Sequence, residues 1–231
     1  MFKDIKQVMK DSVLYGIGNV AVKLVGFILI PLYTDAEYFS TADYGLMGLL
    51  EVTSQILIAV MGLSLYSGLI RWYWDAEYRD KQKTIFFTTL LFTILTSLCI
   101  GSVLWLNVGE LSALLVQQEG YSLGGELPYI LQLLILTSML GAVVEVPQNL
   151  LRLQRKPIYY SLTNIVRLFA TLVLTIYFTI SLHRGVSGVY EAQLVGIVIQ
   201  LLMVLPLVIK NSSCRVDRKC TIQLLAYSYP L

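Results

Sequence analysis

The chain has 231 residues, of which 56% are hydrophobic and only 14% are charged, and its formal net charge is +2. Soluble domains carry about 25% charged residues, so this composition excludes an ordinary soluble protein and is typical of a membrane protein. The small net charge gives no reason to expect binding to nucleic acid.

Apolar runs of membrane-spanning length follow one another along the chain. A helical span needs roughly 20 mostly apolar residues. We predict six such spans, at about 13–33, 45–66, 84–106, 128–150, 160–182 and 186–208. Together they predict an all-α membrane lobe over 1–209, followed by a basic cytoplasmic linker over 210–220. Nearly all of the chain is then helix or short loop, which leaves no room for a soluble catalytic domain.

Two local patterns add detail to these spans. Ser40 stands three residues before Asp43, a capping-box spacing that predicts a helix beginning just after Ser40. Ala192 and Gly196 are four residues apart in the last span, so they lie on one helix face and permit close contact with a neighbouring helix.

Basic residues alternate along the chain in a way that predicts its orientation. Most of the 17 lysines and arginines lie before the first span, after the second, after the fourth or after the sixth. The intervening loops, at 34–44, 107–127 and 183–185, hold a single basic residue, Arg184, and the first two carry acidic residues instead. By the positive-inside rule, both ends of the chain are predicted to be cytoplasmic.

The predicted spans contain embedded charged residues, among them Lys23, Glu51, Glu145 and Arg167. Each costs roughly 2.5 to 3.5 kcal/mol at a helix centre, so it should face a cavity or an opposite charge rather than lipid. Polar residues recur beside them at helical spacing, which favours a hydrated chamber lined by several helices. The predicted polar lining comprises Asn19, Gln55, Gln148, Asn149 and Asn164.

A second interpretation of the same residues stays open. The four embedded charges also fit two interhelical salt bridges that hold the helices together. Arg71 and Arg152, at predicted cytoplasmic helix ends, fit topology signals or snorkelling anchors as well as chamber cations.

No pattern in the sequence predicts an enzyme, a metal site or a bound cofactor. The only histidine is His183, on the predicted outward side. The outward loops are short and acidic, and they contain no recognisable nucleophile and base and no phosphate-cradling glycine loop.

Four segments in order resemble one family of membrane proteins. They are KDSVLYGIGNVAVKLVGFILIPLYT, FSTADYGLMGLLEV, GLSLYSGLIRWYWDAEYRDKQK and NLLRLQRKPIYY. The chain resembles the polysaccharide-transport proteins, including O-antigen flippases, of the multidrug/oligosaccharidyl-lipid/polysaccharide exporter superfamily. The resemblance extends over essentially the whole chain. It implies a fold of two lobes with twelve or more helices, of which this chain would be the N-terminal lobe. The final TIQLLAYSYPL, 221–231, resembles the start of a seventh helix, so we expect a truncated chain.

The resemblance also implies a function, a cargo and a location. The implied function is to flip undecaprenyl-pyrophosphate-linked oligosaccharide across the bacterial cytoplasmic membrane by alternating access, for lipopolysaccharide O-antigen synthesis, with a polysaccharide polymerase as a further partner. Such an anionic cargo would be bound by the chamber cations, which are Lys23, Arg71, Arg152 and Arg167. Glu51 and Glu145 would be the sites of proton or sodium coupling.

Two other functions remain open at this stage. A drug or small-molecule antiporter of the same superfamily would use a similar lobe, although an acidic chamber is expected for its cationic cargoes. A membrane enzyme of polysaccharide assembly is the other alternative.

Overall fold

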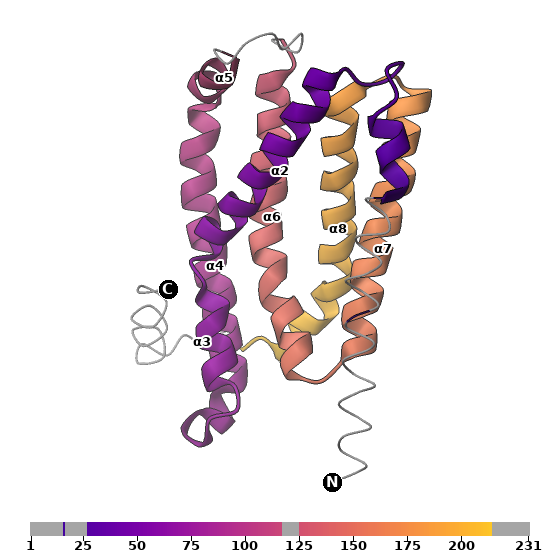
Figure 1. The fold of residues 1–231 in the computed structure, drawn as a ribbon. Helices are drawn as coiled ribbons and strands as arrows, with labels where there is room; N and C mark the ends of the chain where they lie inside the picture. Colours follow the sequence, from indigo (N-terminus) through magenta and orange to yellow (C-terminus); the bar gives the residue numbers. More distant parts are fainter. Residues whose placement is uncertain (1–15, 17–26, 117–124, 214–231) are drawn as a thin grey trace.

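The structure is a computed structural model that describes residue 16 and residues 27–116 and 125–213. The described residues form helices and short connections (Figure 1). The helices are α2 (Thr41–Gly62), α3 (Leu65–Trp72), α4 (Gln82–Leu106), α5 (Val108–Val116), α6 (Leu127–Leu153), α7 (Pro157–Ile176) and α8 (Gly185–Asn211). A 3₁₀ helix spans Ala76–Lys81, a π-helical turn spans Tyr177–Ser181, and residues 27–33 are also helical.

Five helices in the described part are long and apolar enough to cross a membrane. They are Thr41–Gly62, Tyr78–Leu106, Leu127–Leu153, Pro157–Ser181 and Gly185–Asn211. The fold class predicted from the sequence, an all-helical membrane lobe, is confirmed. Most of the first predicted span, 13–33, lies outside the described residues, as does the predicted start of a seventh helix at 221–231.

Helix α6 is the centre of the bundle. It packs against α2, α4 and α8, while α7 packs mainly on α8 (Figure 1). Most of the α6 side chains are buried, and two apolar clusters form around its two ends. One contains Leu46, Leu50 and Leu134, and the other contains Leu69, Phe86 and Leu150. Many large apolar side chains remain exposed along the helices, as expected where helices meet lipid.

Small residues allow the helices to approach closely. An added Cβ at Gly196 in α8 would lie 2.1 Å from Thr171 Oγ1 and 3.3 Å from the carbonyl oxygen of Arg167, both in α7. Ala192, one turn earlier in α8, is fully buried. The close contact predicted at Ala192 and Gly196 is therefore confirmed, and it sets the position of α7 at the level of Arg167.

The N-terminus of α2 has the predicted capping box. The Ser40 hydroxyl accepts a hydrogen bond from the Asp43 N–H at 3.1 Å, and the Asp43 carboxylate accepts one from the Ser40 N–H at 2.9 Å. These bonds satisfy donors that have no partner within the helix. Helix α2 begins at Thr41, four residues before the predicted span.

The sequence predicted one continuous helix over 45–66, and this prediction is wrong because the helix is interrupted after Gly62. Helix α2 ends at Gly62 because Leu63 and Ser64 both adopt left-handed backbone conformations, with φ of 44° and 50°. Helix α3 then begins at Leu65. The break leaves carbonyl groups of α2 without helical partners, and the Thr96 hydroxyl of α4 donates to one of them, Met61 O, at 2.8 Å.

Candidate functional site

A polar cleft of about 240 Å³ opens between α6, α7 and α8, with one side formed by α2. Two basic residues, one acidic residue and four amide side chains line it, which is an unusual density of polar groups within membrane-length helices. The lining residues are Ile58, Gly141, Val144, Glu145, Gln148, Asn149, Arg152, Tyr160, Asn164, Arg167 and Gln200.

Arg167 is held by a chain of amides that joins α7 to α8. Its guanidinium donates to Gln200 Oε1 at 3.1 Å, and Gln200 Nε2 donates to Asn164 Oδ1 at 2.9 Å. Asn164 Nδ2 in turn donates to the Tyr160 carbonyl oxygen at 3.0 Å. Because Gln200 is only 1% exposed, this chain fixes the position of the guanidinium from within the helix contact.

Arg152, near the C-terminus of α6, is oriented by an aromatic residue of α7. Its guanidinium carbon lies 4.6 Å from the centre of the Tyr160 ring, a cation–π distance, and it also donates to the Tyr160 hydroxyl. A weaker contact of 3.4 Å runs from Arg152 to Asn149 Oδ1. The exposed side chain of Arg152 is thus held at the mouth of the cleft instead of extending freely from the helix end.

Two side chains on the α6 wall of the cleft have acceptor oxygens with no partner among the described residues. Gln148 donates through Nε2 to Thr163 Oγ1 at 2.9 Å, but its buried Oε1 accepts no hydrogen bond. The Glu145 side chain forms no hydrogen bond or ion pair with another residue in the described ranges. A ligand that donates hydrogen bonds here and carries negative charge near Arg152 or Arg167 would satisfy both kinds of group.

The structure brings together six of the residues that the sequence analysis singled out. Arg152, Arg167, Glu145, Gln148, Asn149 and Asn164 line the same cleft. Three others are not among its lining residues: Arg71 is exposed on α3, whereas Glu51 and Gln55 are exposed on α2, where Gln55 Nε2 donates to Glu51 Oε1 at 3.3 Å. Lys23 and Asn19 lie outside the described residues.

The sequence left open that Arg167 forms an interhelical salt bridge. Among the described residues, Arg167 forms a hydrogen bond instead of an ion pair. It donates to Gln200, and no ion pair joins it to Glu51 or Glu145 in the part of the chain that is described. The ion pair formed between Arg184 and Glu191 lies at the opposite end of α8, where Tyr129 also donates to Glu191 at 2.8 Å.

Sequence reasoning missed two residues that organise the site, Tyr160 and Gln200. Tyr160 stands one turn before Asn164 and two turns before Arg167, so the helical spacing of the polar stripe could have included it. Gln200 is an amide in the apolar sequence of α8, and an amide in such a helix signals a hydrogen-bond partner on another helix.

Comparison of the fold with solved structures gives consistent matches. A multidrug resistance MATE family transporter of the MOP superfamily, in an outward-facing conformation, superposes with a TM-score of 0.75 at 18% identity over 97% of this chain. The chain has the fold of half a MATE transporter. It covers 51% of that protein, so the chain spans about half the length of the structure it matches.

Two further matches describe the same half. A MOP superfamily transporter from Pyrococcus furiosus has a TM-score of 0.75 at 19% identity, with 97% of this chain and 51% of that chain covered. An inward-facing multidrug resistance MATE family transporter has a TM-score of 0.60 at 17% identity, with 94% and 48% covered. No protein-family model and no curated protein matches the sequence. At these identities the likeness establishes the fold alone.

Proposed function

We propose that this chain is one lobe of a MOP superfamily transporter whose cargo is an anionic, hydroxyl-rich amphiphile of the lipid-linked oligosaccharide class. The observation that carries the proposal is the cleft, which holds two positioned guanidinium groups among four amides and a tyrosine. Guanidinium groups bind phosphate by charge-assisted, bidentate hydrogen bonds. Amides with unpaired oxygens, such as Gln148, suit sugar hydroxyl groups.

The proposed cargo places its charged group at a defined part of the cleft. A pyrophosphate between α6 and α7 would lie near Arg152 and Arg167, where the helix environment weakens solvent screening and strengthens the attraction. Sugar hydroxyl groups would then face Gln148 and Glu145. We propose the bacterial cytoplasmic membrane as the location and alternating access as the mechanism, with Glu145 and Glu51 as sites of ion coupling.

A drug antiporter is the second candidate, and two observations bear on the choice between them. Similar structures are described as multidrug resistance MATE transporters, and Glu145 would attract a cationic drug. The Pyrococcus furiosus transporter, however, is described as having a binding pocket of reverse polarity that suggests a different function. The pair of arginines in the cleft favours the anionic cargo.

Direct binding measurements separate the two candidates. The purified chain in detergent would be titrated with a polyprenyl pyrophosphate and, separately, with a lipophilic cationic dye. Loss of a hydrogen bond to a charged group costs about 1.5 to 3 kcal/mol, so Arg167→Gln should weaken pyrophosphate binding by about tenfold or more. Lys210→Gln, an exposed cation at the end of α8, is the control and should bind as wild type does.

The same variants are expected to give the opposite binding pattern if the chain is part of a drug antiporter. In that case the dye would bind tightly to wild type and weakly to Glu145→Gln, and Arg167→Gln would bind it at least as well as wild type. Pyrophosphate binding that is unchanged in Arg167→Gln would refute the proposed cargo site.

A further inference from the structure

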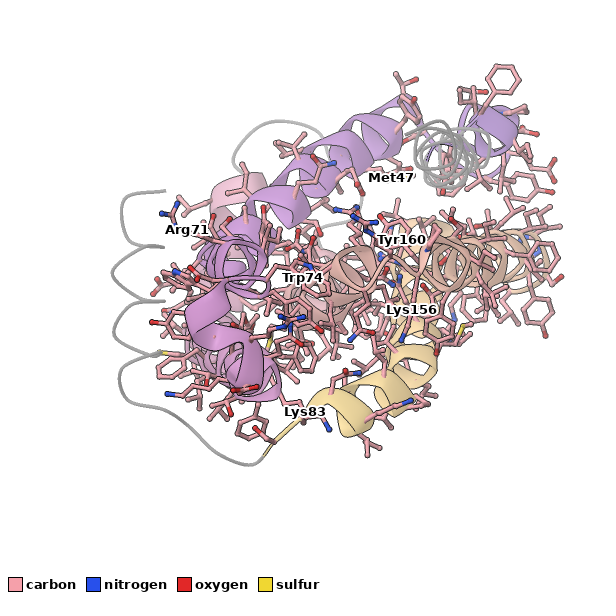
Figure 2. The ribbon with its side chains drawn as sticks, turned by 90° about the horizontal axis from the view of Figure 1, so that it is seen from below. Met47, Arg71, Trp74, Lys83, Lys156 and Tyr160 are labelled. Atoms are coloured by element: carbon pink, nitrogen blue, oxygen red, sulfur yellow. The ribbon has the colours of Figure 1, made fainter. Side chains whose placement is uncertain are left out.

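A second cavity lies at the end of the bundle where α3 ends and α6 turns into α7. It has a volume of about 380 Å³ and is lined by Trp74, Leu153, Gln154 and Arg155. None of these residues lines the polar cleft. Viewed along the bundle from this end, Trp74, Lys83 and Lys156 are all in sight (Figure 2). This end of the bundle is the one that the sequence analysis assigns to the cytoplasm.

Arg155 occupies a backbone position that usually holds glycine. The Arg155 N–H donates to the carbonyl oxygen of Arg152 at 3.1 Å and the Lys156 N–H donates to that of Leu151 at 3.0 Å, which is the Schellman arrangement at a helix C-terminus. The residue at its centre is left-handed, and Arg155 has φ of 52°. This conformation is unfavourable for a residue with a Cβ, so arginine at this position costs stability that glycine would not cost.

The guanidinium of Arg155 has no partner within the described part of the chain. Its side chain is exposed, lines the cavity and makes no hydrogen bond or ion pair with a described residue. Two other basic residues differ from Arg155 in this respect. Arg71 in α3 and Lys81 in the 3₁₀ helix each interact with another residue. Arg155 therefore presents to the cavity a positive charge that no described residue pairs.

The remaining walls are rigid and partly apolar. Gln154 donates to the Tyr73 hydroxyl at 3.1 Å and to Asn211 Oδ1 at 2.9 Å, and it accepts from Lys156 Nζ at 2.7 Å. These bonds connect the ends of α3, α6 and α8 and bring a second cation to the rim. Trp74 is 64% exposed and packs edge-to-face on Tyr73, with ring centres 5.2 Å apart.

We propose that this cavity binds the head group of an anionic phospholipid from the adjacent membrane leaflet. Basic pockets between helices at a membrane surface bind lipid phosphates, and tryptophan favours the depth of the head groups. A cation at the rim beside walls of Trp74 and Leu153 suits an amphiphile better than a fully hydrated ion. Arg155 and Lys156 would contact the phosphate, and Trp74 would lie against the glycerol and upper acyl region.

Native mass spectrometry of the purified chain with defined lipids tests this site. Wild type should retain phosphatidylglycerol in preference to phosphatidylethanolamine. Arg155→Gly should weaken phosphatidylglycerol binding by about fivefold, and Trp74→Leu should also weaken it. Lys83→Gln, an exposed cation at the same end outside the cavity, should bind as wild type does.

The glycine substitution distinguishes lipid binding from a structural role. Because glycine suits the left-handed backbone, Arg155→Gly should unfold in lipid-free detergent at the same temperature as wild type or higher. A lower unfolding temperature would show that Arg155 holds the turn together and would overturn the proposal. So would unchanged lipid binding in Arg155→Gly, or an equal loss in Lys83→Gln, which would indicate diffuse surface charge. Displacement of the lipid by an equal concentration of inorganic phosphate would assign the site to a soluble anion instead.

Discussion

The contact between α7 and α8 at Gly196 is so close that a larger residue there should affect both the stability of the chain and the polar cleft around Arg167. A Cβ added at this position would lie 2.1 Å from Thr171 Oγ1, where 3.4 Å is an ordinary contact. The Thr171 side chain would have to move by about 1.3 Å, and its χ1 angle is stiff because threonine is β-branched. The Arg167 carbonyl oxygen, at 3.3 Å, limits escape in the other direction.

Gly196→Ala should therefore destabilise the chain by about 1 to 3 kcal/mol, the usual cost of overpacking a well-packed contact. The measurement is the free energy of unfolding in mixed detergent micelles, followed by tryptophan fluorescence. Because Arg167 shares the contact, the same variant should also weaken binding of an anionic ligand in the cleft.

A second substitution tests the cause. Thr171→Ala removes the clashing oxygen, so the double variant should recover at least half of the loss caused by Gly196→Ala alone. Gly48→Ala, on the exposed face of α2 with no atom within 4 Å of the added Cβ, is the matched control. The reasoning is refuted if Gly196→Ala is as stable as wild type, or if Thr171→Ala restores nothing.

Three further predictions concern single contacts. Ser40→Ala removes the N-cap of α2 and should cost about 1 kcal/mol of unfolding free energy; an unchanged value would show that the end of α2 frays without effect. Ser64→Gly should raise stability by up to about 1 kcal/mol, because glycine adopts the left-handed conformation without strain, and a loss would contradict this. Gln200→Leu leaves Arg167 and Asn164 without their shared partner and should cost about 1 to 3 kcal/mol, whereas Gln193→Leu, on the same helix, should cost less.

The sequence predicted well the features that depend on helical periodicity. The membrane helices, the capping box at Ser40 and the shared face of Glu145, Gln148, Asn149 and Arg152 all follow from local spacing. Residues on one helix face remain together whichever way the helices pack. The same principle explains why Asn164 and Arg167 lie in one cleft.

Features that depend on how helices are oriented against one another could not be predicted in this way. The polar residues of α2, Glu51 and Gln55, form a stripe like the others, but α2 turns its apolar face to α6 and leaves this stripe exposed. The role of Gln200 depends on a long-range pairing between α7 and α8. The break at Leu63 and Ser64 could not be predicted because neither of these left-handed positions is a glycine or a proline, the residues that usually indicate a helix break.

That break divides the second span into two rigid rods joined by a two-residue joint. A continuous helix resists bending through every backbone hydrogen bond along its length, whereas here only the φ and ψ angles of Leu63 and Ser64 need to change. A tilt of α2 about this joint would leave α3 packed on α4, but it would have to repack Leu46 and Leu50 against α6. Because Ile58, five residues before Leu63, forms part of the cleft, such a tilt would widen or narrow the mouth of the cleft without unfolding any helix.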